Sequence, residues 1–285
     1  METEELVSEL RRAARALVRE LGVVGSRYPN VPCTVTEGNL LLELELDPGL
    51  RVVELAERLV LDKSTTSRAL TGLVQRRLVT VSPDPGDRRR KLFALTRTGR
   101  RMVGRLHATA DSQVREALAW LEPGEPDEVL SATKRYARAL RKARQARGYE
   151  IREIRRQDNL QLLGLLRDVR TEHVAIVGDN VALIEPDEHD LHTLYAGDDR
   201  CYLVIERQGR ILGGGGFSPL AGGEPGWCEL QRMYLRPEVR GMGLGFQLLS
   251  RCLRRAKACG FTDCYLETMA GLQRANRLYE KAGFS

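Results

Sequence analysis

Apolar residues recur at spacings of three and four through the first half of the chain, which is the periodicity of helices that bury one face. The first predicted helix runs from about residue 4 to residue 27, and its apolar face holds Leu6, Leu10, Ala13, Leu17 and Leu21. The pattern predicts further helices over residues 35–46 and 52–59, one that opens at Lys63, and two longer ones over residues 98–121 and after Pro126.

Between the fourth and fifth of these helices, the pattern changes to short strands. Residues 78–82 and 91–95 are predicted strands, joined by the turn Asp84-Pro85-Gly86-Asp87. The tip of this hairpin carries three consecutive arginines, residues 88–90. A helix-turn-helix followed by a basic hairpin predicts a winged helix in the first half of the chain.

The second half alternates strands with helices. Strands are predicted over residues 149–154, 201–206, 210–217 and 228–235, and helices over residues 159–170 and from Gly245 onward. Four consecutive glycines, residues 213–216, remove every side chain from one stretch of strand. We therefore expect a backbone or a ligand to approach closely there.

The length of 285 residues predicts two domains, with a boundary near Gly148 after a basic helical run. Hydrophobic residues at 42% and charged residues at 29% exclude wholesale disorder and collagen. The acidic start and the lack of an 18-residue apolar stretch predict a soluble, cytoplasmic chain that does not enter a membrane. The six scattered cysteines are interpreted as reduced thiols, and no metal site is predicted.

The positive charge is confined to the first half of the chain. Residues 1–148 hold 27 basic and 20 acidic side chains, whereas residues 149–285 hold 18 and 19. Within residues 62–105, 12 basic side chains stand against three acidic ones. A patch this dense favours a polyanion, because each phosphate neutralised releases counterions; a solvated basic face is the alternative.

In the first half, Leu55-Ala56, residues 63–68, Leu78-Val79 and the run DPGDRRRKLFALTRTGR (residues 84–100) resemble the MarR family of winged-helix regulators. The resemblance implies a homodimer held by the first and last helices of the domain. It also implies a recognition helix in the major groove of double-stranded DNA, with the wing in the minor groove. The residues expected to contact DNA are Ser64, Thr65, Thr66 and Arg68 on the helix, and Arg88 and Arg89 on the wing, with Asp87 orienting Arg89.

Two points qualify this interpretation. The hydroxyl residues 64–67 could instead cap the helix N-terminus, which is their usual structural role. The family commonly has glycine before the Leu-Val that follows the recognition helix, and here that residue is Arg77. If Arg77 is left-handed, we expect a cost of about 1 kcal/mol.

A glycine-rich turn joins a strand to a helix at residues 240–245, an arrangement that can cradle an anion. The spacing GxGxG does not match the dinucleotide-binding GxGxxG pattern. Residues 229–284 instead resemble the GNAT superfamily of acyl-CoA-dependent N-acyltransferases. The resemblance is carried by Arg240, Gly243 and Gly245 in the loop, the strand at residues 264–268, and the N-x-x-Y-x-x-x-G-F run at residues 276–284.

The GNAT resemblance implies acetyl-CoA as co-substrate. The backbone of Met233 and Leu235 would bind the pantetheine, Asn276 would contact the cofactor arm, and Tyr279 would protonate the leaving thiolate. No covalent intermediate is expected. The pyrophosphate would be held by the N–H groups of the loop Arg240, Gly241, Met242, Gly243, Leu244 and Gly245.

The acceptor ammonium must lose a proton before it attacks the thioester. Glu229 is the candidate base, with pairing to an arginine as its structural alternative, and Glu267 is a weaker candidate. His173, His189 and His192 fall in the variable segment after the first helix of this domain and are assigned to the surface or to pocket lining.

GNAT domains continue into a further strand beyond the point where this sequence stops, at Phe284-Ser285. Either the natural chain extends further or a neighbouring chain supplies that edge, and the acceptor pocket is expected to be incomplete without it.

The sequence thus predicts a mainly α winged helix-turn-helix domain (residues 1–148) followed by an α/β GNAT domain with a mixed central sheet (residues 149–285). The predicted function is a DNA-binding transcriptional regulator joined to an acetyl-CoA-dependent N-acetyltransferase for a small amine or amino acid. One alternative is a regulator whose second domain only senses acyl-CoA or a metabolite. Another is an enzyme whose basic half serves only for dimerisation.

Overall fold

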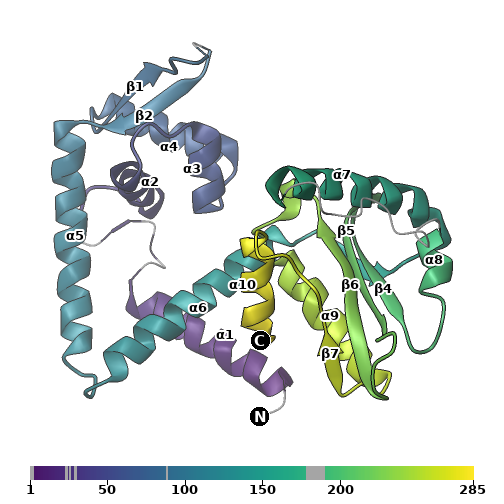
Figure 1. Ribbon diagram of the computed structural model, residues 1–285. Helices are drawn as coiled ribbons and strands as arrows, with labels where there is room; N and C mark the ends of the chain where they lie inside the picture. The colour runs from purple at the N-terminus through teal and green to yellow at the C-terminus, as the bar shows by residue number, and fades with distance from the viewer. Residues whose placement is uncertain (1–2, 23–24, 26, 29–30, 88, 178–189) are drawn as a thin grey trace. The chain divides into compact units, whose positions relative to one another are not determined.

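The computed structural model describes residues 3–22, 25, 27–28, 31–87, 89–177 and 190–285 (Figure 1). The chain divides into two compact units, Met1–Val129 and Leu130–Ser285. This division falls inside one continuous helix, α6 (Glu125–Gln145), whereas the sequence placed the domain boundary after that helix. The functional boundary near residue 148 stays a prediction. In the part of the chain that is described, no helix is long and apolar enough to cross a membrane.

The first unit is a winged helix, as predicted. Its elements are α1 (Thr3–Glu20), α2 (Val35–Leu46), α3 (Val52–Leu59), α4 (Lys63–Gln75), β1 (Val79–Pro83), β2 (Lys91–Leu95), α5 (Arg97–Leu118) and the start of α6. The strands pair as an antiparallel hairpin, Val79 opposite Leu95, which projects from the helices in Figure 1. The core is formed by apolar side chains of α2 to α5 and the hairpin, among them Leu40, Leu41, Leu55, Leu70, Leu73, Phe93 and Val103.

The first helix is shorter than predicted. It ends at Glu20 rather than near residue 27, and Gly22 follows with a φ of 68°, a left-handed conformation that glycine adopts without steric cost. The expected end near residue 27 was therefore wrong by about two turns. No residue of α1 is buried within the chain, and its apolar side chains, including Leu10 and Leu17, are exposed.

The hairpin is fixed to α5 by a close backbone contact. Thr96 caps α5 by accepting a hydrogen bond from the Gly99 N–H (3.0 Å), and its hydroxyl donates to the carbonyl of Arg77 (2.7 Å). A Cβ atom on Gly99 would lie 2.0 Å from the carbonyl oxygen of Leu78. Glycine is therefore required where the helix begins against the start of the wing.

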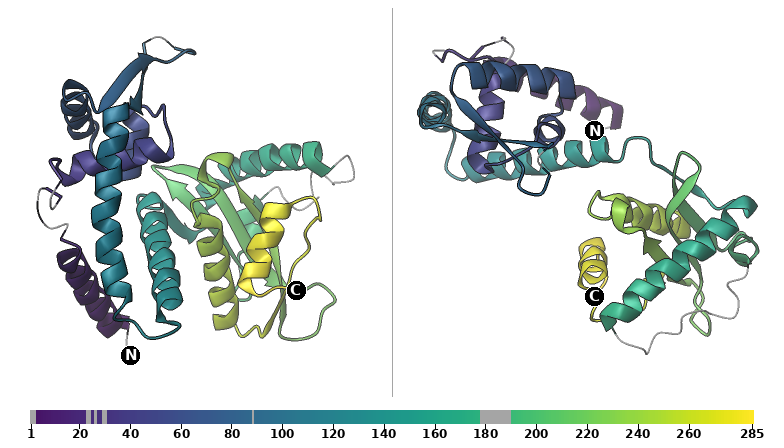
Figure 2. Two further views of the ribbon diagram at one scale, coloured as in Figure 1. Left: turned by 90° about the vertical axis from the view of Figure 1, so that its left-hand side faces the viewer. Right: turned by 90° about the horizontal axis from the view of Figure 1, so that it is seen from above.

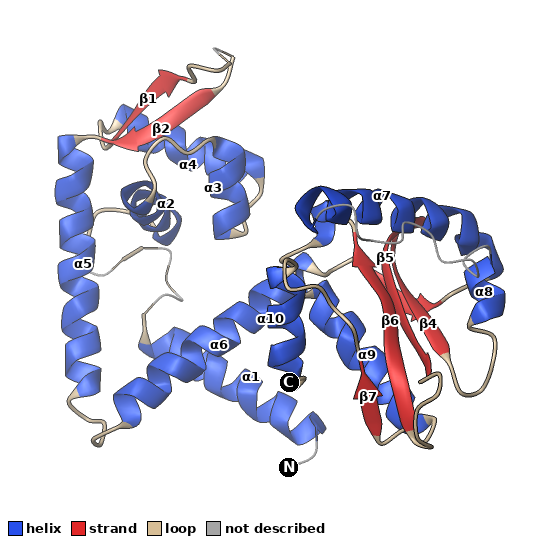
Figure 3. Cartoon of the chain, in the orientation of Figure 1, coloured by secondary structure: helices blue, strands red, loops and turns tan. Residues whose placement is uncertain are grey.

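The second unit is a five-stranded mixed sheet between helices, again as predicted (Figures 2 and 3). Its strands are β3 (Glu150–Glu153), β4 (Cys201–Arg207), β5 (Arg210–Pro219), β6 (Trp227–Leu235) and β7 (Asp263–Tyr265). They lie in sequence order and are antiparallel except for β6 and β7, which are parallel. The helices are η1 (Arg156–Asp158), α7 (Asn159–Val177), α8 (Leu191–Leu194), η3 (Pro237–Val239), α9 (Leu244–Ala258) and α10 (Gln273–Ala282).

Alternating side chains of the sheet supply two cores. On one face, Tyr202 and Val204 of β4 pack with Leu162 and Leu166 of α7. On the other face, Leu203 and Ile205 join the buried side of α9, and α10 packs against the same cluster. Consequently α7 covers one face of the sheet, while α9 and α10 cover the other.

Helix α7 and strand β7 differ most in length from the sequence prediction. Helix α7 continues to Val177 instead of ending at residue 170, so His173 lies on that helix and not in a variable loop. Strand β7 stops at Tyr265, whereas a strand to residue 268 was expected.

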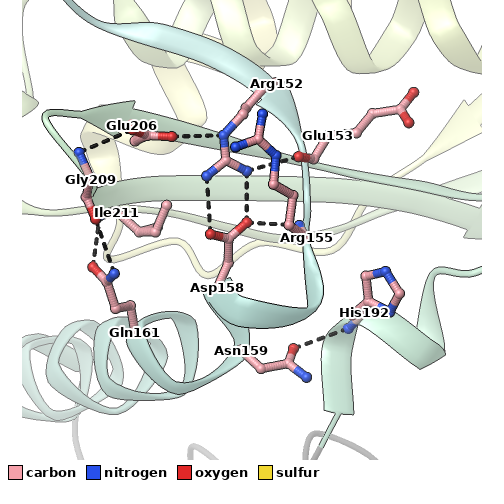
Figure 4. A network of polar contacts seen from close by, with 10 residues as sticks. All are labelled: Arg152, Glu153, Arg155, Asp158, Asn159, Gln161, His192, Glu206, Gly209 and Ile211. Carbon is pink, nitrogen blue, oxygen red and sulfur yellow. Dashed lines mark hydrogen bonds and ion pairs between the residues drawn. The ribbon is translucent and has the colours of Figure 1, made fainter.

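A buried ion pair fixes the entry of the chain into this unit (Figure 4). The Arg152 guanidinium donates to both carboxylate oxygens of Asp158 (2.7 and 3.0 Å) and to Glu206 (2.7 Å). Burial alone would raise the pKa of Asp158, but hydrogen bonds from Arg152 and from the Arg155 N–H outweigh it and lower the pKa below its usual range. The contacts join β3, η1 and β4 directly ahead of α7.

The glycine run of β5 accommodates an aromatic ring. A Cβ atom on Gly214 or Gly216 would lie 2.6 or 2.7 Å from ring carbons of Tyr202, which stands on the neighbouring strand β4. The sequence predicted a close approach there by a backbone or a ligand. A backbone does approach at Gly216, where the carbonyl oxygen of Cys201 would lie 2.5 Å from such a Cβ, whereas the contact shared by both glycines is the Tyr202 ring.

Candidate functional site

Strands β6 and β7 separate after a short stretch of pairing. They pair only from Trp227 to Glu229, opposite Asp263 to Tyr265, so that the rest of β6 presents one edge to which no described strand pairs. A cavity of about 670 Å³ opens there. Its walls include Met233, Tyr234 and Leu235 of β6, residues 271–275 before and at the start of α10, and the side chains of Leu278 and Tyr279.

The loop between β6 and α9 forms one end of this cavity. Gly241 and Gly243 have φ values of 78° and 86°, which L-residues with a side chain rarely adopt. Within the described residues, the N–H groups of Gly241, Met242 and Gly243 make no hydrogen bond, and the first-turn N–H groups of α9 follow them. Together these free donors form a site suited to an anion.

Arg240 holds this loop in place. Its guanidinium makes two hydrogen bonds to the carboxylate of Glu172 on α7 (2.5 and 2.7 Å), and its Nε donates to the carbonyl of Leu235 (2.9 Å). The pairing lowers the pKa of Glu172. The Arg240 backbone N–H donates to the carbonyl of Pro237 (3.2 Å). The sequence analysis expected this N–H among the pyrophosphate donors, and the hydrogen bond to Pro237 does not support that role. Glu172 was not singled out from the sequence.

Cationic side chains surround the same cavity. Arg274, Arg277 and Lys281 of α10 line it together with Arg240. A cavity with free N–H donors and several cations at its edge suits a ligand that carries several phosphates.

Tyr279 stands inside the cavity on α10. Burial, followed by the effect of the nearby Tyr234, raises the pKa of Tyr279 to about 12. Its ring packs edge to face on Phe284, and its hydroxyl has no hydrogen-bond partner among residues that the structure describes. The phenol is therefore protonated at neutral pH and can donate its proton.

Two predicted residues lie elsewhere. Glu229 is absent from the described lining of the cavity and accepts a hydrogen bond from Gln231 (2.7 Å). Asn276 is also absent from that lining: it accepts from Thr268 (2.9 Å) and donates to the carbonyl of Met269 (3.1 Å). Asn276 thus holds the loop before α10, and this position does not support its expected contact with a cofactor arm.

Two of the three histidines of the second unit fall within the described residues, and they lie in different places. His173 lines the cavity, with its ring centroid 5.8 Å from that of Tyr234. His192 lies on α8, where its backbone N–H donates to Asn159 (3.1 Å). His189 lies outside the described residues.

In the first unit, the start of α4 differs from the sequence prediction at one residue. Asp62 is the N-cap and accepts hydrogen bonds from the Thr65 N–H (2.8 Å) and the Ser64 hydroxyl (2.6 Å). Thr66 is fully buried and its hydroxyl donates to the Asp62 carbonyl (3.0 Å), so the prediction that it contacts DNA was wrong. Ser64 and Arg68 are exposed, and Thr65 is half-buried.

The wing arginines also pair differently. The Asp87 carboxylate forms an ion pair with Arg90 (3.0 Å) and accepts only the backbone N–H of Arg89 (3.1 Å). The expected orientation of the Arg89 side chain by Asp87 was therefore wrong, and Arg89 is exposed. Arg88 lies outside the described residues. Arg77 is left-handed, with a φ of 56°, which is the case for which the sequence analysis expected an energetic cost.

Comparison with known proteins finds a different family for each of the two units. Residues 162–284 match the model of the acetyltransferase (GNAT) family, and residues 33–90 match that of the MarR family. The uncharacterized N-acetyltransferase YjgM of Escherichia coli is 37% identical over 134 residues, which span 47% of this chain and 80% of that protein. The chain belongs to the GNAT acetyltransferase family, with a MarR-family domain ahead of the acetyltransferase domain.

Solved structures resemble each domain. A GNAT-family acetyltransferase from Staphylococcus aureus is 19% identical over 47% of this chain and 83% of that chain, with a TM-score of 0.42. BpsR of Bordetella bronchiseptica, whose DNA binding is regulated by 6-hydroxynicotinic acid, is 24% identical over 47% of this chain and 98% of its own, with a TM-score of 0.39.

Within the GNAT domain, the residues that sequence reasoning missed come from α7. Glu172 and His173 follow the last apolar position of the helical pattern, Val169, so the pattern gave no reason to extend the helix to them. The signal that could have found them is a pair of ionisable residues one turn beyond that position.

Proposed function

We propose that this protein is a DNA-binding transcriptional regulator whose GNAT domain transfers the acetyl group of acetyl-CoA to a small amine or amino acid. The observation that carries the enzymatic part is the cavity at the opening between β6 and β7, bounded by the loop of free N–H groups and by cationic side chains. These features fit acetyl-CoA: an extended edge for the amide-bearing arm, a donor-rich loop for the pyrophosphate, and cations for the remaining phosphate.

In this proposal each residue has a separate task. Met233 and Leu235 offer backbone groups along the open edge of β6, and the N–H groups of residues 241–245 hold the pyrophosphate. The thioester of bound acetyl-CoA supplies an electrophilic acyl carbon. Tyr279 keeps its proton until the sulfur departs and then donates it to that atom. The glycine-loop geometry depends on Arg240, whose side chain is held by Glu172.

The enzymatic proposal is tested by release of free thiol from acetyl-CoA across a panel of amino acids and small amines. Turnover on one amine supports the proposal and identifies the acceptor. Tyr279→Phe should then lose rate while its dissociation constant for acetyl-CoA stays within about twofold. If acetyl-CoA raises the melting temperature but no amine is acetylated, the domain is a sensor and the proposal fails.

We also propose that the MarR domain binds double-stranded DNA through α4 and the hairpin. Ser64, Thr65 and Arg68 at the start of α4 and Arg89 near the tip of the wing are the proposed contacts, and Arg88 stays a prediction outside the described residues. Arg68→Ala and Arg89→Ala should each weaken operator binding and reduce its salt dependence by about one released counterion. Arg115→Ala, which removes an exposed cation far along α5, is the control.

A homodimer formed through the N-terminal domain completes the proposal. Its support is the exposed apolar face of α1, with Leu6, Leu10 and Leu17 each more than 40% accessible. Leu10→Glu combined with Leu17→Glu should shift sedimentation from dimer to monomer. Leu46→Glu, at an exposed position on α2, should leave the dimer intact.

A further inference from the structure

The cavity of the GNAT domain contains few groups that can accept a proton at neutral pH. Its described lining holds arginines and lysines, which are already protonated, two phenols, one amide and apolar residues. The remaining ionisable side chains are Glu172 and His173, adjacent on α7. Acetylation of an amine requires such an acceptor, because an aliphatic amine is an ammonium ion at neutral pH and has no lone pair with which to attack.

Glu172 already binds Arg240 and is therefore not available as the base. Both of its oxygens bind the Arg240 guanidinium, at 2.5 and 2.7 Å. The hydrogen bonds from Arg240 lower the pKa of Glu172, which makes it a weaker base. Removing Glu172 from this pair would also release the loop that Arg240 holds.

His173, by contrast, is not held in an ion pair of this kind by any described residue. Its ring is half-buried beside the ring of Tyr234, and within the described chain it forms no hydrogen bond or ion pair. Burial lowers the pKa of His173; Glu172 opposes this shift, while Arg240 and Arg170 reinforce it. Glu172 and Arg170 stand on α7 with His173, and Arg240 belongs to the loop before α9, while Tyr234 of β6 packs beside the ring. The imidazole is therefore neutral at pH 7 and can accept a proton.

We infer that His173 is the general base that takes a proton from the acceptor ammonium. This assignment rests on the proposed acetyltransferase function and replaces Glu229 in that role. Glu229 lies outside the described lining of the cavity, and one of its carboxylate oxygens accepts a hydrogen bond from Gln231.

The proton and electron balance of the step is complete. The ammonium nitrogen gives one proton to a ring nitrogen of His173 and thereby gains a lone pair. That lone pair forms the C–N bond of the amide, and the electron pair of the C–S bond leaves with sulfur. Tyr279 protonates the sulfur, and the nitrogen loses its second proton to water as the amide forms, so no oxidant or further reactant is needed.

The test compares His173→Gln with Glu229→Gln and with His192→Gln, a histidine on α8 outside this cavity. The kcat/KM of His173→Gln for the acceptor should fall by about 100-fold or more, the usual contribution of a positioned base. The other two variants should stay within about threefold of the wild type. The dissociation constant of acetyl-CoA, measured by calorimetry without acceptor, should be unchanged in all three.

Three further readouts separate a base from a structural role. The wild-type kcat/KM should rise with pH through a pKa below the ordinary histidine value of about 6.5, and this limb should disappear in His173→Gln. Added imidazole should restore part of the rate of His173→Ala. The deficit of His173→Gln should also shrink for an acceptor whose amine is already neutral at the assay pH.

The possible failures are distinguishable. If the wild type acetylates an amine but His173→Gln keeps its rate and its pH limb, the assignment is overturned and the proposed function stands. A fall in rate only in Glu229→Gln would return the role to that carboxylate. If the wild type acetylates no amine, the proposed function fails and the assignment fails with it.

Discussion

The hydroxyl of Tyr202 donates a hydrogen bond to the carbonyl oxygen of Arg232, at 3.0 Å. Arg232 has a φ of 49° and stands in a β-bulge, because the register of β5 and β6 shifts between Gly214 and Gly216. The bulge immediately precedes Met233, where β6 becomes part of the cavity wall. Tyr202 thus supports a left-handed non-glycine residue directly beside the proposed active site.

Tyr202→Phe should lower the free energy of unfolding of the GNAT domain by about 1–2 kcal/mol, because the Arg232 carbonyl loses its buried partner. Trp120 and Trp227 are the two tryptophans of the chain, so fluorescence of Trp227 in a Trp120→Phe background reports on this domain alone. Tyr265→Phe removes a hydroxyl bonded to Glu267 at the surface and should have little effect. Equal losses from both variants would contradict a special role for Tyr202.

Glu172→Gln should weaken acetyl-CoA binding about fivefold, corresponding to about 1 kcal/mol, while kcat changes little. The reason is that Glu172 positions Arg240, and Arg240 holds the loop of free N–H groups. Isothermal calorimetry and steady-state kinetics give the two quantities separately. Asp168→Asn, which removes an ion pair between the same helix and Arg236, is the matched control.

Asp158→Asn should destabilise the GNAT domain by about 3 kcal/mol at pH 7, because it leaves the buried Arg152 without its main partner. The folded-state pKa of Asp158 is lowered, so its contribution is present above the unfolded pKa of about 3.9 and is lost as the pH falls through the folded value. Denaturant titrations from pH 7 to pH 3 should therefore show a steeper acid loss in the wild type than in the variant. Asp111→Asn, in an exposed pair with Arg115, should change neither quantity.

Gly99→Ala should destabilise the MarR domain by about 3 kcal/mol or prevent its folding, because the new Cβ would lie 2.0 Å from the Leu78 carbonyl. Gly104→Ala lies on the same helix with no atom within 4 Å of the added Cβ, and alanine should stabilise it by about 0.5–1 kcal/mol. The melting temperatures of both variants, measured by calorimetry, test this prediction. A tolerated Gly99→Ala would show that the helix can move away from the hairpin.

Arg77→Gly should raise the stability of the MarR domain by about 0.5 kcal/mol. Glycine removes the side-chain clash at a φ of 56°, and part of that gain is lost to the greater freedom of the unfolded chain. Gly124→Ala makes the reverse change at a φ of 98° and should lower the melting temperature. Opposite signs for the two variants are the expected result.

The sequence alone determined the order and type of most elements. Helical periodicity predicted α2 with its observed limits, and alternation with turn residues predicted β2 and the basic hairpin. The glycines of residues 241–245 and the run at residues 276–284 identified the second domain. These signals are local: each depends on residues within one or two turns of one another, and their physical causes act over the same short range.

Only the tertiary structure decided which side chains meet. Glu172 and Arg240 are 68 positions apart, and no local pattern pairs them. Thr66 looked exposed beside Ser64 and Thr65, but the packing of α4 buries it. The glycine run predicted a close approach, and the neighbouring strand supplied the Tyr202 ring. Periodicity assigns a residue to a face of its own element, whereas its partner depends on how separate elements pack together.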